Sequence, residues 1–291
     1  MTAVASAWGW LRRNALPIYA GFAVFYMLIP IIVIAVFSFG ATPQGKLTFG
    51  LDHGFTFEYW RTAFSLPELN DALSTSLRLA ALSTAISTAI GTLMAIALVR
   101  HKFRGRRVAN LLIVIPMATP EIVIGASLLS MFIYYTFALG FGTLLIAHVM
   151  FSISFVVVVV RSRLIGFDRN LEEAAADLGA TPLTTFRTVT LPLLAPGIVA
   201  AALLAFALSI DDFVISNFNS GTTVTFPLYV YGVSLRGIPV QVNALATMLF
   251  VVTVLAVMLV LWQQRRAERM AAVRPEREAP PIPAPPAQAT T

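Results

Sequence analysis

The sequence contains no cysteine, which excludes disulfide bonds, thiol nucleophiles and metal sites built on thiolates. Charged residues are also scarce: they make up 12% of the 291 residues, whereas a soluble domain carries about 25%. Hydrophobic residues, by contrast, make up 58% of the chain. A chain with so little charge is neither an ordinary water-soluble globule nor a disordered polymer, so the question becomes how often it crosses a bilayer.

Six segments are long and apolar enough to cross a membrane as helices, which takes roughly 20 residues each. They lie at 17–39, 74–99, 109–136, 141–160, 193–217 and 243–262. The valine run at 156–160 would suit a buried strand in a soluble protein, but a lone strand in lipid would leave its backbone groups unpaired. The first segment is too long for the apolar region of a cleaved signal peptide and is predicted to be a retained anchor. The sequence therefore predicts an all-α integral membrane protein with six transmembrane helices.

The basic residues are distributed unevenly over the loops between these segments. If the N-terminus is cytoplasmic, all but four of the 20 Lys and Arg residues fall on the inner side, and those four are Lys46, Arg61, Arg78 and Arg236. Cytoplasmic loops are enriched in Lys and Arg, so both termini are predicted to be cytoplasmic. The net charge of +6 is then a consequence of topology and gives no support to a nucleic-acid partner.

The chain divides into three predicted regions: a cytoplasmic N-terminus over 1–16, a transmembrane domain over 17–262 and a cytoplasmic tail over 263–291. The tail begins with Arg, Glu and Ala and becomes proline-rich from Ala279 onward. Such a composition buries too little apolar surface to offset the entropy of ordering, so the end of the tail is predicted to be disordered.

One stretch is similar to a phosphate-binding loop, Gly40 to Lys46, but Leu47 stands where a Ser or Thr hydroxyl should hold magnesium. The stretch also follows a membrane segment and faces the outside. It is therefore interpreted as an outer turn, and any nucleotide hydrolysis must come from another polypeptide.

Small residues recur every three or four positions along the second segment: Ser76, Ala80, Ser83, Ser87, Gly91 and Ala95. In lipid, helices associate through the close backbone approach that such residues allow, so this stripe predicts helix packing. In the fourth segment, His148 is predicted to be a hydrogen-bonded packing residue.

Three carboxylates, Glu121, Asp211 and Asp212, lie inside predicted spans, where an ionisable group is costly and points to function. At 1.5 Å per residue Glu121 lies about 18 Å from the inner end of its span, and the two aspartates lie toward the outer end of theirs. All three are expected in the outer half of the bilayer. They either form a cation-attracting translocation path or gate, or they are a hydrogen-bonded cluster at helix ends.

The cytoplasmic loop before the fifth span predicts two short helices. Asp168 or Asn170 can cap the first, and Gly179 can end it because glycine readily adopts positive φ. Thr181 followed by Pro182 can begin the second helix, which is expected to run to about residue 189. The alanines at 174–176 would let a partner approach closely, while a neighbouring glutamate supplies a charged contact.

The same loop resembles the EAA loop of binding-protein-dependent ABC importer permeases. The residues that match are Glu173, Ala174, Ala175, Gly179, Leu191 and Pro192, with Val189 where the family often has Ile. Three further segments look like the spermidine/putrescine-type C subunit: Phe103 to Arg106, Pro120 to Gly125 and Ser209 to Ser216.

The resemblance implies a MetI-like ABC type I importer fold with cytoplasmic EAA coupling helices in 168–192. It also implies a bacterial inner-membrane protein that works with a second permease subunit, a cytoplasmic ABC ATPase dimer and a periplasmic solute-binding protein. The chain itself would bind no cofactor or metal and would not be an enzyme, since ATP and Mg would be handled by the partner ATPase.

The implied cargo is a small cation, a polyamine such as spermidine or putrescine, with an opine, an aminoalkylphosphonate or another small amine as alternatives. An ion-coupled secondary transporter is a more distant alternative. A polytopic membrane enzyme is disfavoured, because the spans offer neither a nucleophile with a base nor a metal cluster.

Overall fold

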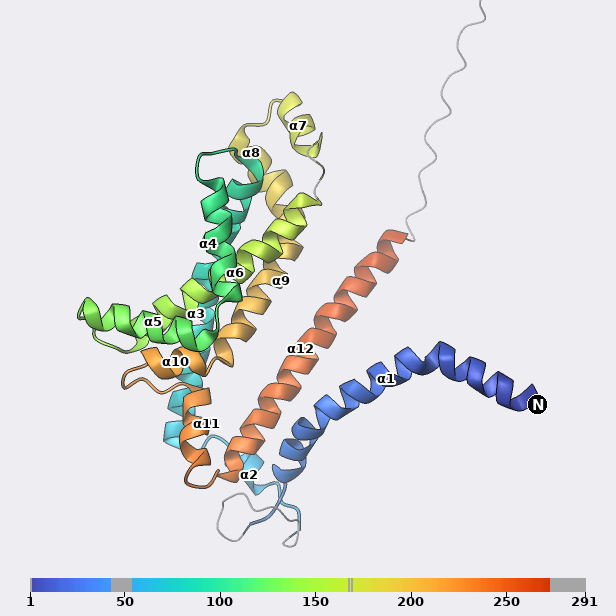
Figure 1. Ribbon diagram of the computed structural model, residues 1–291, viewed down its shortest axis with the longest axis vertical. Coiled ribbons are helices and arrows are strands. Elements are labelled where there is room, and N and C mark those ends of the chain that lie inside the picture. The colour runs from blue at the N-terminus through green and yellow to red at the C-terminus, as the bar shows by residue number, and fades with distance from the viewer. Residues whose placement is uncertain (1, 43–53, 167, 169, 273–291) are drawn as a thin grey trace, which may run out of the picture. The chain divides into compact units, whose positions relative to one another are not determined.

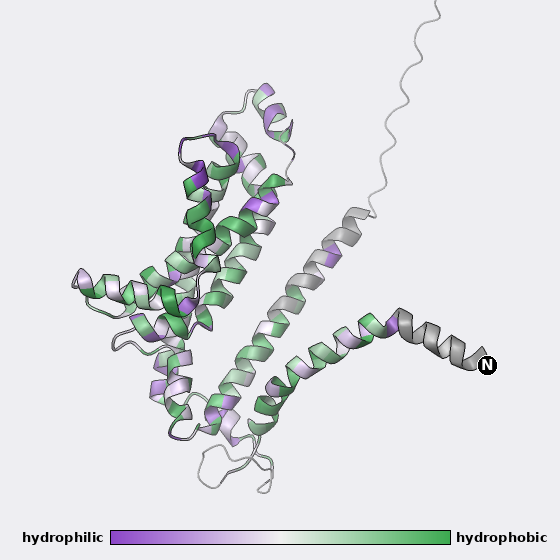
Figure 2. Cartoon of the chain, viewed as in Figure 1, coloured by the Kyte–Doolittle hydropathy of each residue, from purple (hydrophilic) through white to green (hydrophobic). Residues whose placement is uncertain are grey.

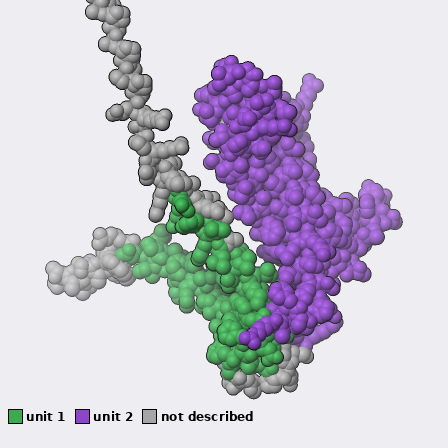
Figure 3. All heavy atoms as spheres, turned by 180° about the vertical axis from the view of Figure 1, so that it is seen from behind, with its two compact units in different colours: residues 1–60, 240–291 green, residues 61–239 purple. Residues whose placement is uncertain are grey.

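The computed structural model describes residues 2–42, 54–166, 168 and 170–272. Helices make up nearly all of the secondary structure of these residues, and one isolated bridge pairs Gly40 with Phe55 (Figure 1). The chain forms two compact units, residues 1–60 with 240–291 and residues 61–239, which Figure 3 shows in different colours. The prediction of an all-α chain is confirmed for the described residues.

The first unit contains α1 (Thr2–Phe37), α2 (Glu58–Arg61) and α12 (Val240–Ala272). Beyond the end of α1, the ring of Phe39 stacks on Trp60 with centroids 4.9 Å apart. The indole Nε1 of Trp60 donates to Ser38 Oγ at 3.1 Å, so the α2 segment is held against the end of α1. The predicted outer turn at 40–46 and the proline-rich end of the tail fall largely outside the described residues.

The second unit is built on three helices, α3 (Pro67–Arg100), α6 (Phe141–Ile165) and α9 (Leu191–Ile210), which pack against one another. The predicted packing stripe on α3 is confirmed, because its six small residues are all buried. A Cβ added at Gly91 would lie 2.6 Å from Val156 Cγ1 on α6, so the close approach of these two helices requires glycine there.

The third predicted span is not one straight helix. It is divided into α4 (Arg106–Ala118) and α5 (Glu121–Tyr134), which are bent by 111° at Thr119 and Pro120. A proline has no N–H to continue the helical ladder and disfavours the helical conformation of the residue before it. The predicted span over 109–136 is therefore a bent pair of apolar helices, which is either one broken span or a re-entrant loop.

The fifth predicted span also differs from its expected bounds. The α9 helix ends at Ile210, and the chain turns through Asp211 and Asp212 into α10 (Val214–Asn219) and later α11 (Phe226–Ser234). The α10 helix packs on α5, where Asn219 Nδ2 donates to the carbonyl of Gly125 at 3.3 Å. The helices that follow the two breaks thus pack against each other.

The cytoplasmic loop forms α7 (Asn170–Asp177) and α8 (Pro182–Thr185), followed by a π-helical turn, η1 (Phe186–Thr190). A separate second helix was expected, but α8, η1 and α9 form one apolar helix over Pro182–Ile210. The wide turn explains why Pro192 does not break this helix, since a π turn spaces the backbone differently where a proline ring would otherwise clash with the carbonyl four residues earlier.

Among the described residues, four helices are long and apolar enough to span a membrane, or five if the bent α4–α5 pair is one span. The sixth predicted segment, 243–262, lies on α12, of which the apolar part within the fully described residues is Val240–Leu255. Figure 2 shows how hydrophobic residues follow these helices. The count of six spans remains a prediction.

Candidate functional site

The first coupling-loop helix begins and ends as the sequence predicts. Asp168 Oδ1 accepts the backbone N–H of Asn170 at 3.0 Å at the start of α7. At its other end, Gly179 has a φ of +83° and Ala180 N donates to the carbonyl of Ala175 at 3.0 Å. This hydrogen bond spans five residues around a left-handed glycine and is the Schellman arrangement that satisfies the last carbonyls of a helix.

The second helix is capped by Thr181, as predicted. Its hydroxyl oxygen accepts the N–H of Thr184 at 3.3 Å, and Pro182 occupies the first helical turn, where no N–H is needed. Leu191 and Pro192 form the first turn of α9, directly after η1.

The α7 helix presents its predicted contact residues to the outside. Glu173 and Ala174 are exposed, Ala175 is half-buried and none of the eight residues of α7 is fully buried. Just beyond the helix, Leu178 is 90% exposed. The exposed side of α7 and the turn after it thus carries one charged, one small and one large apolar side chain.

A glutamate that sequence reasoning missed anchors this helix. Glu172 Oε1 accepts hydrogen bonds from Arg100 Nη2 at 2.8 Å and from Thr190 Oγ1 at 2.7 Å. Arg100 is the last residue of α3 and Thr190 the last residue of η1. The only sequence signal was its position one residue before Glu173, which turns the side chain by about 100° around the helix and away from the exposed face.

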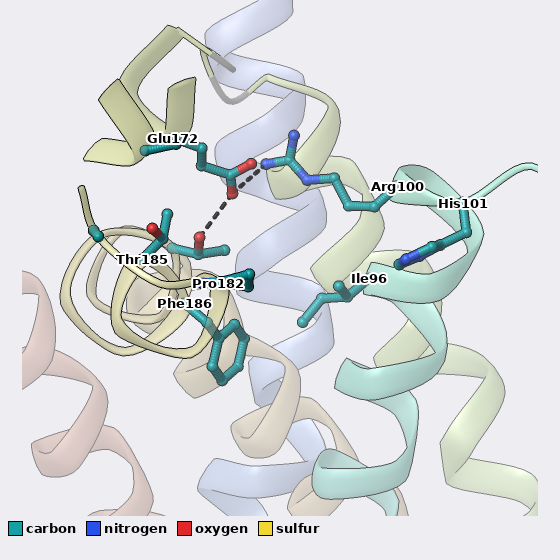
Figure 4. A pocket seen from close by; sticks show the side chains of 10 residues that line it. Ile96, Arg100, His101, Glu172, Pro182, Thr185 and Phe186 are labelled. Carbon is teal, nitrogen blue, oxygen red and sulfur yellow. Dashed lines mark hydrogen bonds and ion pairs between the residues drawn. The ribbon is translucent and has the colours of Figure 1, made fainter. Parts of the chain in front are cut away.

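These three residues line a pocket of about 490 Å³ between α3, α7, α8 and η1. Figure 4 shows Arg100 and Glu172 facing each other across it, with Ile96, Pro182 and Phe186 below the ion pair. The pocket combines one ion pair with mostly apolar walls.

The three predicted acidic residues come together at the two helix breaks. Glu121 is the first residue of α5, Asp211 caps the end of α9, and Asp212 follows it. The negative charges of both aspartates act on Glu121, so the three carboxylates lie within range of mutual repulsion. Their expected position in the outer half of the bilayer stays a prediction.

The two aspartates nevertheless occupy different surroundings. Asp211 and Glu121 are exposed, whereas the side chain of Asp212 is only 5% exposed. The Asp212 carboxylate accepts the backbone N–H groups of Ile215 at 3.2 Å and Ser216 at 2.8 Å. It therefore satisfies the free donors at the start of α10, which is a structural task.

His148 lies in a buried network beside Asp212 and has the hydrogen-bonded packing role that the sequence predicts. Its Nδ1 is 2.8 Å from Ser209 Oγ, its Nε2 is 3.1 Å from Ser216 Oγ, and the same Nε2 is 3.5 Å from an Asp212 oxygen. Ser83 Oγ on α3 donates to Ser209 at 3.0 Å. The network joins α3, α6, α9 and α10 through groups that are each hydrogen-bonded, as buried polar atoms require.

No group of three or more His, Asp or Glu side chains with the arrangement of a metal site occurs in the described parts of the chain.

Residues 87–270 match the family described as binding-protein-dependent transport system inner membrane component. The spermidine/putrescine transport system permease protein PotC of Escherichia coli K12 is 40% identical over 234 residues, which cover 80% of this chain and 87% of that protein. The putrescine transport system permease protein PotI of the same organism is 36% identical, over 79% of this chain and 82% of its own length.

The fold is also that of a solved transporter. A chain of the bacterial ABC transporter involved in import of the acidic polysaccharide alginate superposes with a TM-score of 0.63 at 17% identity, over 91% of this chain and 99% of that one. At this identity the likeness concerns the fold alone. Because the family match covers most of the chain, the chain belongs to the inner membrane components of binding-protein-dependent transport systems, the ABC importer permeases.

Proposed function

We propose that this chain is the membrane-spanning permease subunit of an ATP-driven importer that takes up a polyamine such as spermidine or putrescine. The observation that carries the proposal is the similarity to PotC and PotI over about four fifths of the chain. An opine, an aminoalkylphosphonate or another small amine is the alternative cargo for the same machinery.

In this proposal the chain has six transmembrane helices in a MetI-like type I importer fold, with α12 contributing the sixth. The region 17–262 is the permease domain, and both termini, 1–16 and 263–291, lie in the cytoplasm of a bacterium. A second permease subunit completes the pathway in the inner membrane. A cytoplasmic ATPase dimer binds and hydrolyses ATP with Mg, and a periplasmic binding protein delivers the cargo.

The coupling surface in this proposal consists of Glu173, Ala174, Ala175 and Gly179, with Leu191 and Pro192 at the start of the connected span. ATP binding would close the ATPase dimer, move α7 and α8, and turn the permease pair from inward-open to outward-open. Such a shift requires that ATP bind one arrangement better than the other. The helix Pro182–Ile210 supports this mechanism, because it connects α8 to a span through the π turn with no loop between them.

The translocation path in this proposal uses Glu121 and Asp211, while Asp212 positions the break between α9 and α10. The first two are exposed and repel one another, so a cation placed between them would relieve that repulsion. Both carboxylate oxygens of Asp212, in contrast, already accept hydrogen bonds from backbone N–H groups. A polyamine, which carries several separated positive charges, suits a pair of carboxylates.

The deciding experiment is uptake by the complete complex in proteoliposomes, with ATP enclosed on the side of the ATPase subunits. The binding protein is added outside and is loaded in turn with putrescine, spermidine, an aminoalkylphosphonate and an opine. We expect polyamines to stimulate ATP hydrolysis and to be taken up. Stimulation by one of the other ligands alone would contradict the polyamine assignment. Uptake that continues without ATP hydrolysis and follows an ion gradient would favour a secondary transporter.

A further inference from the structure

The α7 helix has little of its own to hold it in place. It is eight residues long and has no buried residue. Isolated helices shorter than about 12–15 residues are marginal in water, so their stability comes from contacts with the rest of the protein. A helix that must transmit force to the spans needs a fixed attachment to them.

Glu172 supplies such an attachment through a single oxygen. That oxygen accepts from Arg100 at 2.8 Å and from Thr190 at 2.7 Å, and thus connects α7 to the end of α3 and to the turn that begins α9 (Figure 4). The side chains of Arg100 and Glu172 are only 12% and 22% exposed, and Thr190 is 5% exposed. Charge-assisted hydrogen bonds are short and strong, and partial burial protects them from screening by salt.

We propose that Glu172 is the positioning residue of the coupling loop: it clamps α7 to α3 and α9, so that displacement of α7 by a partner moves both spans together. Glu173 and Ala174 contact the partner in this scheme, whereas Glu172 faces inward and carries the motion onward. The inference rests on the proposed importer function. It adds a residue that lies outside the EAA pattern.

The clamp is tested on the complete transport complex in proteoliposomes, with uptake and ATP hydrolysis measured together. In Glu172→Ala we expect uptake per ATP hydrolysed to fall about tenfold, a change typical of a lost coupling interaction, while hydrolysis continues. Arg100→Ala should give a similar loss. The double variant should be no worse than Glu172→Ala alone, because residues that act through one contact are not additive.

Thr190→Val and Thr188→Val form a matched pair in the same helical segment. Thr190 donates to Glu172, whereas Thr188 Oγ1 donates at 2.8 Å to the carbonyl of Thr184 within its own helix. We expect Thr190→Val to lower uptake per ATP and Thr188→Val to leave it unchanged. Hydrogen exchange of the α7 amides in the assembled complex should rise in Glu172→Ala and Thr190→Val, because exchange reports local opening.

Two failures can be told apart. If the wild-type complex takes up no cargo, the proposed function is wrong. If it does, but Glu172→Ala retains wild-type uptake per ATP and wild-type exchange in α7, or if the losses in Glu172→Ala and Arg100→Ala simply add, the clamp is overturned and the importer assignment stands.

Discussion

At the scale of single residues, Asp211 and Asp212 show that neighbours of the same type serve different purposes. Asp211 is exposed at the end of α9, while Asp212 is buried and caps α10 beside His148. Their order in the sequence gives no hint of this division, because it depends on where α9 ends. The sequence interpretation of one acidic cluster is therefore split into a surface charge and a structural cap.

We expect Asp211→Asn to raise the KM for polyamine uptake by about two- to fivefold with little change in thermal stability, because an exposed ion pair is worth roughly 0.2–1 kcal/mol. Asp212→Asn should instead lower the stability of the complex, since an amide nitrogen cannot accept a backbone N–H and an unsatisfied buried group costs about 1–3 kcal/mol. Uptake kinetics and thermal unfolding of both variants provide the measurement. A loss of stability in Asp211→Asn with a raised KM in Asp212→Asn would contradict this assignment of the two roles.

At the scale of elements, the coupling loop depends on the backbone at Gly179. Gly179 and Gly142 both have open space around the position of an added Cβ, but Gly179 has positive φ and Gly142 lies within α6. Non-glycine residues in the left-handed conformation cost about 1–2 kcal/mol. An added methyl group would meet no neighbour at either position, so a difference between alanine variants at the two sites would report backbone strain at Gly179 alone.

We expect Gly179→Ala to reduce uptake per ATP hydrolysed while leaving the amount of protein in the membrane unchanged, because the strained turn misplaces the end of α7. Gly142→Ala, the matched control, should transport as the wild type does. Uptake, ATP hydrolysis and membrane abundance are measured on the same preparations. Equal behaviour of the two variants would show that the left-handed turn has no part in coupling.

The elements also show which features the sequence could predict. The caps at Asp168, Gly179 and Thr181 were predicted correctly because they depend on residues within one helical turn. The prolines beside Glu121 indicate that the third span can be interrupted, but the 111° angle at Pro120 could not be predicted, because hydropathy reports composition and contains no direction. Glu172 was missed because its partners lie 72 and 18 residues away in the chain, where no local rule reaches.

At the scale of the whole molecule, the distribution of basic residues predicts which side of the membrane each loop faces. It rests on the positions of the Lys and Arg residues, of which only four would lie outside. The absence of cysteine makes the test direct, since any single introduced thiol is the only one that can react.

We expect Arg104→Cys, in the basic loop before α4, to be protected from a membrane-impermeant maleimide in intact cells and labelled after lysis. Tyr135→Cys, beyond the end of α5, should be labelled in intact cells. Both positions are exposed in the structure, so protection reports the membrane and not burial. Labelling of Arg104→Cys but not of Tyr135→Cys in intact cells would show that the chain has the opposite orientation in the membrane.

The π turn at Phe186–Thr190 determines which side of α9 faces its neighbours. Each helical residue advances the side chains by about 100°, so the additional residue in this turn rotates everything after it by about that angle relative to an unbroken α-helix. The buried face of α9, which includes Leu194, Gly197 and Ala201, is presented to its neighbours only with that offset. A single-residue deletion in this short stretch would therefore convert the π turn into a regular α-helical turn and keep the same face of the span turned inward, whereas a regular turn at the full length would turn a different face inward.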